Sequence, residues 1–143
     1  MIILVLIGTV MWGMSSLIPS ASLSIPYRSY LCSVAVVVGI VIALTAIRSF
    51  RAAQTTTNPM DPDAAERLVT NGVYQLSRNP MYLGATLLLL ALAVYLQNAM
   101  AFVTMPLFMI YLTLFQIRPE ERILTEKFGE QFRSYEKSVR RWL

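Results

Sequence analysis

Four long apolar segments without a charged residue constrain this chain more than any other feature of its sequence. They hold 17, 17, 16 and 19 residues and run over positions 2–18, 31–47, 81–96 and 99–117. At about 1.5 Å per helical residue, each segment extends roughly 24 to 29 Å, close to the thickness of a bilayer's hydrocarbon core. This spacing predicts an all-α membrane protein with about four transmembrane helices.

The composition agrees with a membrane domain and excludes several kinds of catalytic site. Of 143 residues, 56% are hydrophobic and only 14% are charged, whereas soluble domains carry about 25% charged residues. We therefore expect one integral membrane domain over residues 1–143. The chain has no histidine and one cysteine, Cys32, which excludes histidine triads, imidazole proton shuttles and intrachain disulfides. We expect no metal site.

The basic residues predict the orientation. In a four-span arrangement, Arg28 lies alone on one side, and the other eleven basic residues fall within 48–80 and 118–143. By the positive-inside rule these two segments form one cytoplasmic layer, with both termini in the cytoplasm. We expect a bacterial inner-membrane protein. The net charge of +4 is then expected to face anionic lipid headgroups and not nucleic acid. The oligomeric state is left open.

Two alternatives concern the spans themselves. The third segment is short enough to form a re-entrant hairpin with the fourth. The first resembles a signal peptide followed by the small residues 20–22, but it lacks the basic start of such peptides. Pro106 removes a helical hydrogen bond and is expected to kink the fourth span beside a pocket.

The cytoplasmic layer carries several helix-boundary signals. Asp63 and Glu66 have capping-box spacing, with Asp61 as an alternative cap, so a short cytoplasmic helix is expected to end near 71–72. Asn79 and Pro80 have the residue types of a cap and first position for the third span.

The C-terminal part shows helical periodicity. Apolar residues recur at spacings of 4, 4, 3, 4 and 3, namely Leu124, Phe128, Phe132, Tyr135, Val139 and Trp142. We expect a C-terminal amphipathic helix, bent at Gly129. Before it, Pro119 is expected to bend or restart a helix whose first turn carries Glu120 and Glu121, where the helix dipole favours carboxylates.

Two clusters, 72–84 and 118–121, compete for a functional role. Helix caps, an arginine at the membrane interface and an aromatic belt account for most of their residues individually. Both clusters lie at cytoplasmic span ends, however. Together they offer two cations, two anions and two phenols around one helix start, the polar groups that a charged small molecule requires.

The order of these motifs resembles the membrane methyltransferases that include isoprenylcysteine carboxyl methyltransferases and phospholipid methyltransferases. The resemblance covers residues 54–143 and rests on 68–74, on 78–84, and on Glu120 and Glu121 followed by 128–129 and Tyr135. Many members have Arg-His-Pro where this chain has Arg78, Asn79 and Pro80. Asparagine caps and hydrogen-bonds but carries no proton.

The resemblance implies S-adenosylmethionine as methyl donor. The matching positions that would line the donor pocket are Leu68, Val69, Tyr74, Asn79, Pro80, Met81 and Tyr82, with Glu120 reaching one of the donor's polar groups. By our own inference from charge, Glu120 binds the ammonium group, Tyr74 or Tyr82 the sulfonium region, and Arg78 or the start of the third span the carboxylate.

The expected acceptor is lipophilic or small, enters from the bilayer, and carries a carboxylate or thiol, as an isoprenylcysteine does. Arg118 is the candidate that steers it. A phospholipid amine is one alternative, with Glu121 as the base that an amine requires. A second alternative is an NADPH-dependent membrane reductase, because sterol reductases share a similar Arg-x-Pro-x-Tyr-x-Gly segment. A third is a non-catalytic membrane scaffold.

Overall fold

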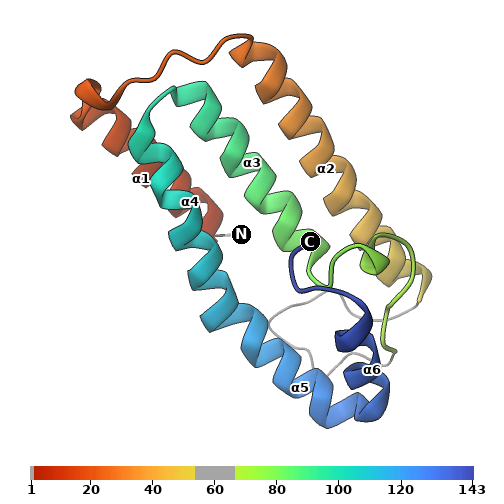
Figure 1. Ribbon diagram of the computed structural model, residues 1–143. Coiled ribbons are helices and arrows are strands. Elements are labelled where there is room, and N and C mark those ends of the chain that lie inside the picture. Colours follow the sequence, from red (N-terminus) through yellow and green to blue (C-terminus); the bar gives the residue numbers. More distant parts are fainter. Residues whose placement is uncertain (1, 54–66) are drawn as a thin grey trace. The chain divides into compact units, whose positions relative to one another are not determined.

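The computed structural model describes residues 2–53 and 67–143, and within them every regular element is helical (Figure 1). The α-helices are α1 (Ile2–Leu17), α2 (Arg28–Ala52), α3 (Pro80–Leu96), α4 (Ala99–Leu112), α5 (Arg118–Phe128) and α6 (Glu130–Ser138). Two 3-10 turns, η1 (Pro19–Ala21) and η3 (Gly72–Gln75), and a π-helix, η4 (Thr113–Ile117), complete the set. The predicted all-α class is confirmed.

The helices agree with the apolar segments of the sequence. Two are long and apolar enough to cross a membrane, namely α2 and the continuous helix Ala99–Phe128, while α1 and α3 are shorter. Only 11% of the most apolar window of α2 is buried. An apolar helix that buries so little against protein is suited to a lipid environment. Four crossings, the re-entrant hairpin and the orientation of the termini stay predictions.

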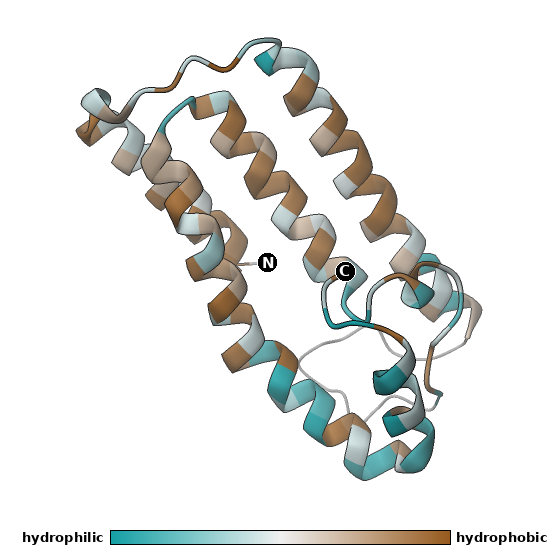
Figure 2. Cartoon of the chain, viewed as in Figure 1, coloured by the Kyte–Doolittle hydropathy of each residue, from teal (hydrophilic) through white to brown (hydrophobic). Residues whose placement is uncertain are grey.

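The chain divides into two compact units, residues 1–40 with 84–110 and residues 41–83 with 111–143. The second unit closely matches the predicted polar layer. Figure 2 shows mostly apolar residues along α2, α3 and α4 and more polar residues along α5 and α6.

In the first unit, Gly39 lets α2 and α3 approach closely. A Cβ atom on Gly39 would lie 3.0 Å from the carbonyl oxygen of Gly84 and 3.1 Å from the Cβ of Leu87. The α3–α4 turn is fixed by Asn98, whose amide donates to the carbonyl of Ile18 at 2.9 Å and whose oxygen accepts from the N–H of Met100 at 2.9 Å. Because Asn98 is 2% exposed, these bonds satisfy a buried polar group.

Pro106 lies inside α4, and the helix continues through it to Leu112. The kink and adjoining pocket predicted at this proline stay predictions. Beyond Leu112, Pro119 has no N–H to donate, and the preceding turn is the π-helix η4. There the N–H of Arg118 donates to the carbonyl of Thr113, five residues back. The helix therefore reaches α5 without ending, so Pro119 does not restart it.

The second unit has its own core, formed by α2, η3 and the C-terminal helices. Its fully enclosed members are Ala46, Tyr74, Phe132 and Tyr135, and the rings of Phe50 and Tyr74 meet edge to face at 5.3 Å. Partly buried residues pack around them, namely Phe50, Leu68, Val69, Val73, Met81, Leu124, Phe128 and Val139. These hydrophobic contacts hold the segment before α3 against α6.

Two boundaries in this unit differ from the sequence prediction. The capping residues Asp61, Asp63 and Glu66 lie outside the described residues, but 67–71 are not helical. A helix ending near 71–72 is therefore wrong, and Gly72, at φ +66°, opens the turn η3 instead. Glycine adopts this left-handed conformation at little cost.

The predicted C-terminal amphipathic helix is broken at Gly129, which has φ +53° and separates α5 from α6. The bend predicted there is confirmed. The helix also ends earlier than its periodicity indicated, because Val139 is extended at φ −129° and ψ 135°. Val139 and Trp142 therefore lie beyond α6.

We predict that Gly39→Ala lowers the melting temperature in detergent. The added methyl crowds a backbone oxygen, and overpacking costs about 1–3 kcal/mol, more than the gain of roughly 0.5–1 kcal/mol from replacing a helical glycine. Gly13→Ala is the matched control, because nothing lies within 4 Å of its Cβ position. Equal melting temperatures for the two variants would contradict the close approach.

Candidate functional site

The candidate site lies in the second unit, where the start of α3 meets the start of α5. Pro80 is the first residue of α3, as predicted, and the carbonyl of Asn79 accepts from the N–H of Leu83 at 3.0 Å. The N–H of Asn79 donates to the hydroxyl of Ser77 at 3.1 Å. Its side-chain amide donates to the carbonyl of Arg141 at 3.0 Å, and so ties the helix start to the C-terminal segment.

Glu120 links α5 to α3 through neutral donors. Its Oε1 accepts from the hydroxyl of Tyr82 at 2.6 Å and from the amide of Gln116 at 2.9 Å. Within the described residues, its Oε2 accepts no hydrogen bond and the carboxylate forms no ion pair. A partly buried carboxylate with only neutral donors gains most from a cation placed beside it.

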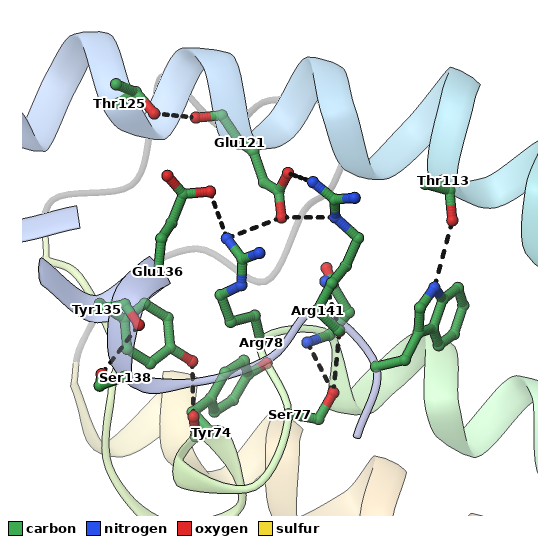
Figure 3. Close-up of polar contacts among 12 residues, drawn as sticks. Tyr74, Ser77, Arg78, Thr113, Glu121, Thr125, Tyr135, Glu136, Ser138 and Arg141 are labelled. Carbon is green, nitrogen blue, oxygen red and sulfur yellow. Dashed lines mark hydrogen bonds and ion pairs between the residues drawn. The ribbon is translucent and has the colours of Figure 1, made fainter. Parts of the chain in front are cut away.

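Glu121 has entirely different partners (Figure 3). Arg141 binds it with two hydrogen bonds, Nε to Oε1 at 3.0 Å and Nη2 to Oε2 at 2.6 Å, and Nη1 of Arg78 lies 3.0 Å from Oε1. The Glu121 side chain is only 12% exposed. The hydrogen bond from Arg141 to Glu121 raises the pKa of the arginine. Glu121 is thus neutralised by two cations.

Arg78, like Glu121, forms ion pairs with two residues. Besides Glu121, its Nη1 donates to Glu136 on α6, and its side chain is 11% exposed. Its Nε is buried and has no hydrogen-bond partner in the described structure. A buried donor without an acceptor is costly, so this atom favours a ligand that supplies an oxygen.

Aromatic residues border these charges. The hydroxyl of Tyr135 donates to the main-chain carbonyl of Tyr74 at 2.7 Å. Burial raises the pKa of Tyr74, and the charges of Tyr135 and Glu120 add to the effect. Leu68, Val69 and Met81, predicted to line the donor pocket, pack against the core that contains Tyr74.

The structure thus brings together Tyr82 with Glu120 and Arg78 with Glu121. Their roles at a methyl-donor site stay predictions. Arg118 is exposed, and its steering role stays a prediction. The ion pairs of Glu121 argue against its assignment as a free base. Sequence reasoning missed Ser77, Gln116, Glu136 and Arg141. Gln116 had a local signal, because it lies one helical turn before Glu120.

Comparison with known proteins gives one family. A family model described as phospholipid methyltransferase matches residues 27–131. A protein of Haemophilus influenzae, described as uncharacterized, is 43% identical over 63 residues, which are 44% of this chain and the whole of the relative. No solved structure gives a significant match.

We predict that Tyr135 makes the fold sensitive to alkali. Burial raises the pKa of Tyr135 to about 12, from 10.0. Between pH 10 and about 12, the phenol of Tyr135 loses its proton in the unfolded chain but keeps it in the folded protein. The free energy of unfolding therefore falls as the pH rises through this range.

Tyr135→Phe should lower the melting temperature at pH 7, because the Tyr74 carbonyl loses its donor, at a cost of about 1–3 kcal/mol. The substitution should also make the loss of unfolding free energy between pH 10 and 12 smaller than in the wild type. Tyr30→Phe, at a residue that is 69% exposed, is the control. The melting temperatures of the wild type, Tyr135→Phe and Tyr30→Phe are measured across this pH range. Equal dependence of the melting temperature on pH in the wild type and Tyr135→Phe would refute the prediction.

Proposed function

The chain belongs to the phospholipid methyltransferase family, and from that premise we propose that it transfers a methyl group from S-adenosylmethionine to a lipophilic acceptor at the membrane. Membership of a methyltransferase family argues against the reductase and scaffold alternatives. The observation that carries the donor assignment is Glu120, a partly buried carboxylate whose partners are neutral.

The residues present suit this donor. S-adenosylmethionine supplies an activated methyl group on a sulfonium centre and also carries an ammonium and a carboxylate. Oε2 of Glu120 is available to the ammonium. The aromatic ring of Tyr82, held by its hydroxyl on Glu120, offers a π-face to the sulfonium region.

Arg78 and the start of α3 suit the carboxylate of the donor. The unpaired Nε of Arg78 provides a charge-assisted donor, although its Nη1 is held by Glu121 and Glu136. The dipole of α3, which begins at Pro80, adds a favourable field for an anion at this end of the helix. Anion and cation binding groups thus lie on adjacent elements of one unit.

The ion pairs of Glu121 favour an acceptor that is already ionised. In the transfer, a lone pair of the acceptor forms the new bond to carbon, and the sulfur–carbon bond breaks with its electron pair left on sulfur. A carboxylate, as in an isoprenylcysteine, or a thiolate needs no base for this step, and alignment with exclusion of water is the main requirement. Arg118, exposed at the start of α5, is the residue we assign to steering such an anion.

A phospholipid amine is the second candidate, because the matching family model is described as phospholipid methyltransferase. An ammonium group has no lone pair until it loses a proton, so this acceptor needs a base or alkaline conditions. The two candidates therefore differ in their pH dependence.

We predict that Glu120→Gln weakens the binding of S-adenosylmethionine by about 10- to 100-fold, because a hydrogen bond to a charged group contributes about 1.5–3 kcal/mol. Glu126→Gln is the matched control, since Glu126 is 66% exposed and pairs only with Arg122 within the described residues. Titration calorimetry in detergent measures both. Unchanged affinity in a folded Glu120→Gln protein removes the assignment.

The acceptor is tested by rate against pH with labelled donor, using vesicles of phosphatidylethanolamine in parallel with N-acetyl-S-farnesylcysteine. A carboxylate acceptor, with a pKa of about 3.5, should give a rate that is flat from about pH 6 to 8. An amine acceptor should give a rate that rises with pH. Methylation of the phospholipid alone would replace the first candidate by the second.

A further inference from the structure

The C-terminal segment, residues 139–143, is not part of a helix and lies along the residues before α3. The N–H of Arg78 donates to the carbonyl of Arg140 at 3.0 Å. The carbonyl of Arg141 accepts from Ser77 at 3.3 Å and from Asn79 at 3.0 Å. Three successive residues immediately before α3, at positions 77–79, are thus bound to two successive carbonyls of this segment.

The same segment also reaches the helix on the other side of the site. The side chain of Arg141 forms its two hydrogen bonds with Glu121 in the first turn of α5 (Figure 3). The indole N–H of Trp142 donates to the hydroxyl of Thr113 in η4 at 3.3 Å. Residues 139–143 therefore bind both elements that carry the candidate site.

From these contacts we propose that residues 139–143 are a strap that sets the distance between the start of α3 and the start of α5, with Arg141 as the positioning residue of the donor site. The proposal rests on the proposed function. Within the site itself, these two helix starts are joined by the bond between Tyr82 and Glu120, at 2.6 Å. A change in their separation would act directly on that bond.

The charges explain why Arg141 matters more than a surface arginine. Arg78 and Arg141 face Glu121 and Glu136, so the network is balanced. Without Arg141, Arg78 alone faces two carboxylates, and Glu121 at 12% exposure loses its bidentate partner. An under-compensated buried carboxylate is unstable, so α5 would shift and take Glu120 with it.

The first test is donor affinity. Arg141→Gln should weaken S-adenosylmethionine binding by about tenfold, because Glu120 would no longer be held in position, while kcat at saturating donor changes little. Arg141→Lys should recover part of the affinity, since lysine keeps the charge but not the bidentate geometry. Arg133→Gln is the matched control, because Arg133 is 59% exposed and pairs with Glu130 on the same helix.

The second test needs no ligand. Hydrogen exchange of the full chain should be faster at residues 77–83 in Arg141→Gln than in wild type or Arg133→Gln, with Arg141→Lys between them. Unchanged donor affinity together with unchanged exchange in Arg141→Gln overturns the strap. If Arg141→Gln does not fold, donor affinity and hydrogen exchange are both measured on Arg141→Lys. Affinity and exchange rates equal to those of the wild type in Arg141→Lys then overturn the proposal.

The two proposals fail in different ways. If the wild-type chain binds no S-adenosylmethionine, the proposed function fails, and the exchange experiment still decides whether the strap exists. If the wild type binds the donor and Arg141→Gln binds it equally well, the donor site stands and Arg141 is not a positioning residue.

Discussion

Adjacent carboxylates in the first turn of α5 take different partners, and the candidate site depends on that separation. Successive residues on a helix point about 100° apart, as follows from 3.6 residues per turn. Glu120 therefore meets a phenol and an amide, while Glu121 meets two arginines. Had the arginines reached Glu120, the site would hold a neutralised pair instead of a carboxylate ready for a cation.

The route of the chain into α5 supports this separation. A proline one residue before Glu120 would ordinarily disrupt a helix, but the π-helix η4 precedes it, and the helix runs without a break from Ala99 to Phe128. Single π-turns of this kind are frequent at functional sites. Gln116 within η4 then lies one turn before Glu120 and donates to it. The same helix is apolar in its first part and carries the carboxylates in its last part (Figure 2).

Much of this architecture can be predicted from the sequence because it depends on local patterns. The four charge-free segments correspond to the apolar helices α1, α2, α3 and α4, and the charges of 48–80 and 118–143 marked the second compact unit. Pro80 at the first position of α3 and the break at Gly129 follow from backbone chemistry alone. Tyr82 and Glu120 were identified through the motif resemblance, and the structure joins them by a hydrogen bond.

The remaining features depend on contacts between distant residues. Arg141 had the periodicity of a polar helical face, yet α6 ends at Ser138 and Arg141 binds a carboxylate 20 positions earlier. Glu136 meets Arg78 across 58 positions, which no local pattern encodes. Residues 67–71 show the same limit, since they are not helical and Leu68 and Val69 pack against the core.

The central claim is that this site recognises a methionine-derived cation, and calorimetric titration of the detergent-purified chain tests it most directly. The account predicts saturable binding of S-adenosylmethionine and of its demethylated product, with no binding of NADPH in the same folded sample. Binding of NADPH alone would contradict it and indicate a reductase, and the absence of binding by all three would leave a membrane scaffold.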